Sequence, residues 1–149
     1  MEIRRLFVYG SLRQGEENEM ARLLHARSRY LGAGTIRARL YAISWYAGAV
    51  ASADAGDVVR GDLFELDAGS AGEVMAALDA YEGSDFRLSP VDVEMPGETP
   101  LRAHAYLYAA SAEGLPWIRH GDWPRSGSAA GEAGNGRGAT GLAHPAEPG

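Results

Sequence analysis

The sequence contains no cysteine and no lysine, and each absence removes a class of chemistry. Without cysteine there is no thiol nucleophile, disulfide, thiolate metal site or cysteine-bound iron–sulfur cluster. Without lysine the chain cannot form a Schiff base, attach pyridoxal phosphate or complete a P-loop. All 14 basic residues are arginine. Covalent catalysis by a thiol or an amine side chain is therefore excluded.

Long hydrophobic runs and basic clusters are also missing. The first apolar run, residues 6–9, has four members, whereas a secretory signal needs roughly seven or more. No run approaches the about 18 apolar residues of a membrane span. The net charge is −6 and no basic stripe is visible, which disfavours nucleic acid as a partner. We expect a cytoplasmic protein with no membrane or nucleic-acid partner.

The 149 residues leave room for one domain with one core. Periodic apolar patterns extend over residues 1–124 and then stop. Residues 125–149 are rich in glycine and alanine, and Leu142 is their only large apolar side chain. Such a segment cannot bury enough apolar surface to offset its chain entropy, so it is predicted to be a disordered tail. The alternative is a tail used for binding.

The apolar patterns predict an α+β fold. Asn18 is a candidate cap for a helix over 19–27, and Ser70 with Glu73 forms a capping-box pattern for a helix that Gly83 ends. Strands are predicted at 3–9, 30–43, 58–66, 91–94 and 102–108. Because strands and helices do not alternate regularly, a parallel Rossmann-type sheet is disfavoured. A curved antiparallel or mixed sheet carrying two helices fits better.

Several familiar site patterns fail on inspection. Residues 10–15 have the glycine spacing of a P-loop, but Glu16 and Glu17 follow where Lys and Ser or Thr would be needed. Residues 32–34 begin a dinucleotide-like pattern that Arg37 interrupts, so a bend in a strand explains these glycines better. The four histidines are scattered and no Gly-x-Ser-x-Gly elbow exists. We therefore expect neither a metal site nor a hydrolase triad.

Two features remain as candidates for a site. The turn Tyr9-Gly10-Ser11-Leu12 follows a strand, and successive amide N–H groups at such a turn can bind a carboxylate or an oxyanion. Glu82 stands at the end of the second predicted helix, where the helix dipole disfavours its ionised form. The alternatives are an ordinary turn and a solvated surface glutamate. Only burial would supply the further pKa shift that a tuned base requires.

Taken together, these features resemble the gamma-glutamylcyclotransferase-like (AIG2-like) family. The resemblance spans nearly all of residues 6–123 and rests on five short pieces in order. These are Leu6-Phe7-Val8-Tyr9-Gly10-Ser11-Leu12-Arg13-Gln14-Gly15 with Asn18 and Leu23-Leu24, then Gly61-Asp62-Leu63-Phe64-Glu65-Leu66, then Leu78-Asp79-Ala80-Tyr81-Glu82-Gly83 with Phe86-Arg87, then Ala105-Tyr106-Leu107-Tyr108, and finally Ile118 with Gly121-Asp122-Trp123. The last two pieces match the bacterial branch.

The resemblance implies a small barrel-like sheet flanked by helices, and a transferase or lyase that needs no cofactor. Such enzymes convert a small gamma-glutamyl amine or conjugate into 5-oxoproline and a free amine. By position, Glu82 matches the catalytic acid/base, the turn from Tyr9 to Leu12 matches the substrate loop, and Tyr108 matches a substrate-binding tyrosine. The substrate carries its own nucleophile, its α-amine, so one carboxylate suffices for proton transfer.

The chain departs from the family pattern at three positions. Ala47 replaces the usual proline after Tyr46, Glu19 replaces a common basic residue, and Phe86 replaces a frequent tyrosine. Two other functions use the same residues: a catalytically silent binding module, and a maturation enzyme that removes a gamma-glutamyl protecting group from a secondary metabolite. The sequence specifies neither the leaving amine nor the oligomeric state.

Overall fold

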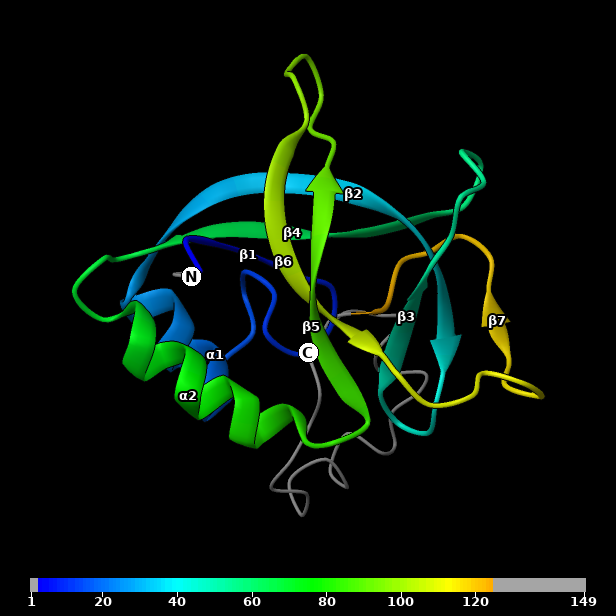
Figure 1. Cartoon of the computed structure of the whole chain (residues 1–149), viewed down its shortest axis with the longest axis horizontal. Helices are drawn as coiled ribbons and strands as arrows, with labels where there is room; N and C mark the ends of the chain where they lie inside the picture. Colours follow the sequence, from blue (N-terminus) through cyan, green and yellow to red (C-terminus); the bar gives the residue numbers. More distant parts are fainter. Residues whose placement is uncertain (1–2, 125–149) are drawn as a thin grey trace.

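Seven strands and two helices make up the part of the chain that the computed structural model describes, residues 3–124 (Figure 1). In chain order they are β1 Arg5–Val8, α1 Glu19–Ala26, β2 Ser28–Ala42, β3 Ala47–Ala51, β4 Val58–Leu66, α2 Ala71–Glu82, β5 Phe86–Val93, β6 Leu101–Tyr108 and β7 Trp117–Ile118. The predicted tail, 125–149, lies outside the described residues. Neither helix of the described region has the length and apolarity needed to cross a bilayer.

The strands form one mixed sheet in the order β3-β2-β4-β1-β6-β5, and β7 pairs with β2. Only β1 and β6 run parallel among these pairs. Thr35 in β2 and Glu94 just after β5 exchange two backbone hydrogen bonds of 2.9 and 2.8 Å, which bring the two sides of the sheet together. The sheet is thus a nearly closed barrel, and the predicted α+β, barrel-like fold is confirmed.

Two glycines in β2 permit this closure. Gly32 has a φ of 136° and follows a register irregularity after Tyr30, so the strand bends there as the sequence predicts. A Cβ on Gly34 would lie 2.8 Å from a methyl of Val93 and 2.9 Å from the carbonyl oxygen of Glu94. A larger residue would push the two strands apart. The long arch of β2 over the sheet is visible in Figure 1.

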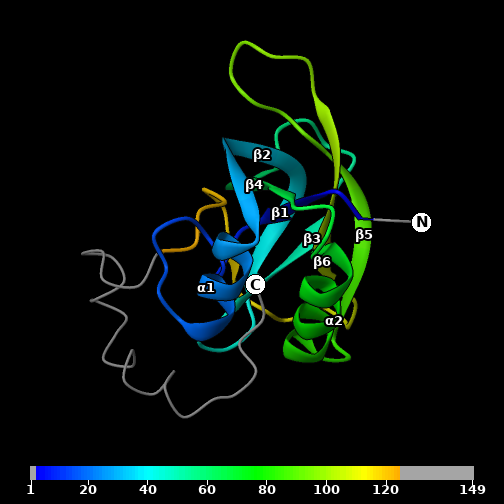
Figure 2. The same cartoon turned by 90° about the vertical axis from the view of Figure 1, so that its left-hand side faces the viewer.

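The core has two parts, one on each face of the central strands. Leu6 and Val8 of β1 face the helices, whereas Phe7 and Tyr9 face the barrel interior, as strand alternation requires. Helices α1 and α2 lie next to each other against the outer face (Figure 2). Because both faces are covered, the segment 6–9 is apolar throughout rather than alternating.

The two helices have different N-terminal caps, and a glycine ends the second one. Asn18 caps α1, because its side-chain oxygen accepts a hydrogen bond of 2.8 Å from the amide of Ala21. The capping box predicted for α2 is wrong: Ser70 has helical backbone angles and makes no side-chain cap bond, and Glu73 instead pairs with Arg27 at 3.2 Å. Gly83, with a φ of 82°, ends α2 as predicted and leaves Glu82 as the last helical residue.

Candidate active site

Glu82 is buried, with 3% of its surface exposed, although it lies at the end of a helix. Burial is the main cause that raises the pKa of Tyr9 and of Tyr106, and Glu82 adds to the effect in both. The carboxyl group of Glu82 is therefore shielded from bulk water at the end of α2. The interpretation of Glu82 as a solvated surface residue is wrong.

Tyr9 joins three parts of the barrel. Its hydroxyl donates to the carbonyl oxygen of Tyr106 at 2.7 Å and accepts from the amide of Ala49 at 3.0 Å. Burial is the main cause that raises its pKa, and Glu82 adds to the effect. The phenol therefore stays protonated at neutral pH and anchors the start of the turn to β6 and β3.

The carbonyl groups of the turn are held by donors from the protein. The oxygen of Gly10 accepts from the amide of Arg13 at 3.2 Å. The oxygen of Ser11 accepts from Nδ2 of Asn18 at 2.7 Å, and that of Leu12 accepts from Nε2 of His25 at 2.8 Å. His25 in turn stacks on Phe64 of β4, with ring centroids 4.8 Å apart. The first helix thus fixes the direction in which the peptide groups of the turn point.

A hydrogen bond links this turn directly to the end of α2. Oγ of Ser11 lies 3.1 Å from the hydroxyl of Tyr81, the residue before Glu82. The structure therefore brings together two segments that are about seventy residues apart in the sequence. A carboxylate and a turn of main-chain amides at such a junction can move a proton and bind an anion.

Tyr108 lies on the same face of β6 as Tyr106, two residues further along. Its ring meets that of Phe86 edge-on at 5.5 Å. A Cβ on Gly48 of β3 would lie 2.9 Å from the Cβ of Tyr108, so the glycine permits this close approach. Tyr108 is therefore placed beside β3 and β5, on the same face of β6 as Tyr106.

Sequence reasoning missed two features of this region. Tyr106 donates a short hydrogen bond of 2.5 Å to Asp79, which ties α2 to β6. Below the turn, the carboxylate of Asp62 is fully buried and accepts from Nε of Arg13 at 3.1 Å. The sequence does point to Arg13 and Asp62, because both lie in the sequence pieces that carry the family resemblance.

The burial of Tyr9 and Tyr106 can be tested by titrating the protein to alkaline pH. Tyr9 and Tyr106 hold their protons above the ordinary tyrosine pKa of 10.0 in the folded chain, chiefly through burial, whereas the unfolded chain releases them near that value. Their raised pKa values favour the folded state below about pH 10, and this stability is lost as pH rises further. We expect two of the seven tyrosines to ionise only on unfolding, as measured by tyrosinate absorbance and circular dichroism. Titration of all seven in one step with the fold intact would contradict this assignment.

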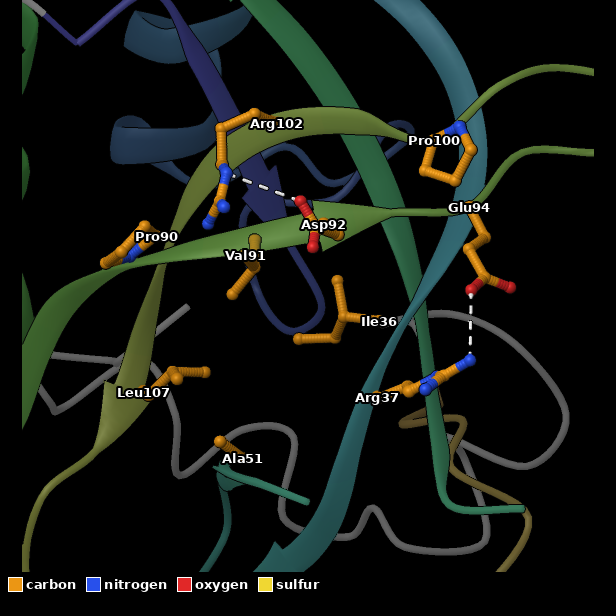
Figure 3. Close-up of a pocket in the computed structure, with 10 residues that line it drawn as sticks. All are labelled: Ile36, Arg37, Ala51, Pro90, Val91, Asp92, Glu94, Pro100, Arg102 and Leu107. Carbon is orange, nitrogen blue, oxygen red and sulfur yellow. Dashed lines mark ion pairs between the residues drawn. The ribbon is translucent and has the colours of Figure 1, made fainter. Parts of the chain in front are cut away.

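A separate cavity of about 360 Å³ is lined by residues of β2, β3, β5 and β6 (Figure 3). Ile36, Val91 and Leu107 contribute apolar side chains to it. The charged groups on its rim pair with one another, Arg102 with Asp92 at 3.3 Å and Arg37 with Glu94 at 3.9 Å. Since these charges largely cancel, the cavity offers no evident selection for an ion. Within residues 3–124 no cluster of three or more His, Asp or Glu side chains is arranged to hold a metal.

Comparison with known families gives one clear match. A family model described as "Gamma-glutamyl cyclotransferase, AIG2-like" matches residues 6–125. A search among curated proteins gives no significant match.

Solved structures with this fold come from several kingdoms. An AIG2-like protein from Mus musculus superposes with a TM-score of 0.66 at 21% identity, covering 88% of this chain and 94% of that one. An uncharacterized protein from Pyrococcus horikoshii gives 0.62 at 22% identity, covering 95% and 98%. YkqA from Bacillus subtilis gives 0.64 at 24% identity over 81% of this chain, but the match spans only 39% of YkqA. At these identities the likeness shows the fold, and it does not single out a bacterial branch.

Proposed function

Because the chain belongs to the gamma-glutamyl cyclotransferase, AIG2-like family, we propose that it converts a small gamma-glutamyl amine or conjugate into 5-oxoproline and a free amine. The observation that carries the proposal is the burial of Glu82 next to Tyr81, whose hydroxyl lies 3.1 Å from Oγ of Ser11 in a turn whose carbonyl groups are held by other donors. Glu82 can carry a proton, and the turn of residues 9–12, which we call the cradle, can bind an anion. These are the two elements that the reaction needs. The proposed enzyme is bacterial and cytoplasmic, and uses no cofactor.

The proposed reaction is an intramolecular acyl transfer. The α-amine of the substrate, in its neutral form, attacks the γ-carbonyl carbon, and a carbon–nitrogen bond of the five-membered ring forms. Glu82 accepts the proton that this nitrogen releases. The bond from the γ-carbon to the leaving nitrogen then breaks, and Glu82 returns the proton to that nitrogen. No water molecule is consumed, and atoms and charge balance.

The turn from Gly10 to Leu12 is proposed to hold the substrate. The carbonyl oxygens of this turn are engaged by Arg13, Asn18 and His25. We propose that its main-chain N–H groups bind the α-carboxylate or the developing oxyanion. Holding the substrate chain folded is largely an effect of orientation, which is where much of the rate of a ring closure originates. We propose that Tyr9 anchors the cradle from its buried position, and that Tyr108 of β6 forms one wall of the substrate site.

The direct test is a panel of gamma-glutamyl conjugates incubated with the full chain, with release of 5-oxoproline as the readout. We expect at least one conjugate of a small amine to be turned over without added metal or cofactor. Binding of the conjugates without any turnover would favour a silent binding module. Activity restricted to one secondary metabolite would favour the maturation enzyme.

Asn18 allows the cradle to be tested apart from the helix cap. Its side chain caps α1 through the amide of Ala21 and also donates to Ser11. Asn18→Ser keeps a good cap but cannot reach Ser11, whereas Asn18→Ala loses both bonds. We expect the alanine variant to be less stable by about 1 kcal/mol, and both variants to lose activity by about 3- to 10-fold, the equivalent of one hydrogen bond. Full activity in Asn18→Ser would mean that the orientation of the Ser11 carbonyl is unimportant.

A further inference from the structure

Arg13 and Asp62 belong to the sequence pieces that carry the family resemblance, yet the proposed chemistry uses neither. Both are buried, with 6% and 0% of their surfaces exposed. Asp62 pairs in the sheet with Val8, the last residue of β1, and so lies directly below the turn. A charged pair inside an apolar core requires a physical reason, because the cost of removing both charges from water often matches the attraction between them.

The Asp62 carboxylate binds the turn through both a side chain and the backbone. One oxygen, Oδ2, accepts from Nε of Arg13 at 3.1 Å and from the amide of Gln14 at 3.0 Å. The other oxygen, Oδ1, accepts from the hydroxyl of Tyr30 in β2 at 3.0 Å. The end of the turn is therefore fixed to β4 by a group that β2 also orients.

Arg13 extends this network to a third segment of the chain. Its NH1 group donates to Asp122 at 2.8 Å, and Asp122 follows Gly121, whose carbonyl oxygen accepts from the amide of Arg60 in β4. The guanidinium group is planar, so its Nε and NH1 groups fix the distance and direction between the two carboxylates. A lysine ammonium could not impose that geometry.

We propose that Arg13 and Asp62 are positioning residues for the substrate cradle. The Asp62 carboxylate and the Arg13 guanidinium hold residues 10–14 in a fixed position relative to β4 and to the end of α2. This inference rests on the proposed cyclotransferase function of the turn. Asp62 fixes the backbone at Gln14, while Asn18 and His25 fix it at Ser11 and Leu12. The turn is thereby restrained at both ends before any ligand arrives, which is the condition for an orientation effect on ring closure.

The test compares Arg13→Lys with Arg39→Lys in the full chain. Arg39 is a matched control because it also pairs with a carboxylate, Asp57 at 2.7 Å, away from the turn. For each variant the measurements are kcat and KM for 5-oxoproline release, the thermal midpoint, and amide hydrogen exchange of residues 10–14 and of α2. We expect Arg13→Lys to lower kcat/KM by about 100-fold and to speed exchange in the turn with little change in α2. The control should match the wild type in both.

Each outcome decides the question. A lower thermal midpoint with wild-type kcat/KM and wild-type exchange in the turn would show that the pair only stabilises the fold, and the proposal would be overturned. If Arg13→Lys does not fold, Asp122→Ala replaces it, because that carboxylate is 48% exposed and its loss removes the acceptor that holds the NH1 end of the Arg13 guanidinium in place. Faster turn exchange in this variant supports the proposal, and unchanged exchange overturns it. If the wild type turns over no conjugate, the cyclotransferase function fails, and the exchange measurements alone then decide whether the network positions the turn.

Discussion

Replacing Glu82 with glutamine should reduce 5-oxoproline release by about 100- to 10,000-fold, the range that general acid–base groups contribute. Glutamine has nearly the same shape and fills the same buried position, but it cannot accept and return a proton. Because Glu82 is only 3% exposed, bulk water has poor access to replace it. The measurement is a time course of 5-oxoproline under saturating substrate, with circular dichroism to confirm the fold.

The matched control is Glu73→Gln on the same helix. Glu73 lies in the first turn of α2 and pairs with Arg27 at the surface, its side chain being 78% exposed. We expect this variant to keep full activity and to change the free energy of unfolding by less than about 1 kcal/mol. Activity that survives in Glu82→Gln while the control behaves as expected would remove Glu82 from the mechanism. A loss of activity with unchanged or higher stability is the expected signature of a buried catalytic carboxylate.

Replacing Gly61 with alanine should destabilise the protein by about 3 kcal/mol, at the upper end of the cost of overpacking a core. A Cβ at this position would lie 2.3 Å from the carbonyl oxygen of Val8 and 2.6 Å from the ring of Phe7. One obstacle is backbone and the other is a fully buried ring, so neither can move without shifting β1. Because β1 leads into the turn, we expect activity to fall together with stability, as measured by thermal unfolding and by the 5-oxoproline assay.

Gly72→Ala is the control for Gly61→Ala, because the same substitution is expected to raise stability there. Gly72 lies in the first turn of α2, and a Cβ there would meet no atom within 4 Å. Alanine favours a helix over glycine, so this variant should be more stable by about 0.5–1 kcal/mol and equally active. If both alanine variants were destabilised to the same extent, close packing of β1 on β4 would not be the cause.

The main elements of the fold could be predicted because their signals are local. The cap at Asn18, the stop at Gly83 and the strand that starts at Val58 were each visible in the sequence, and the structure places a helix or strand end there. Strand β3 was missed because Ala47–Ala51 contains only small residues and one valine, which have little intrinsic strand preference. It forms because β2 offers a paired edge. Strand β7 is two residues long and likewise depends on β2.

The site was harder to predict because its contacts are distant in sequence. Glu82 and the turn were recognised through the family resemblance, but nothing in the sequence showed that Tyr81 reaches Ser11 or that Tyr106 reaches Asp79. The burial of Glu82 could not be read from a helix that ends in polar residues. It follows from the packing of α2 on β6 and on the end of β1, which only the folded chain brings together.

The early position of β1 in the sequence affects how the chain folds during synthesis. Strand β1 is synthesised before β4 and β6, the strands with which it pairs, whose residues begin at Val58 and Leu101. Until both have been synthesised, the apolar segment from Leu6 to Tyr9 has no complete partner and remains exposed to association with other nascent chains. The same event that buries this segment also brings the turn to the end of α2. A growing chain therefore completes the candidate site and covers this apolar segment in one late step.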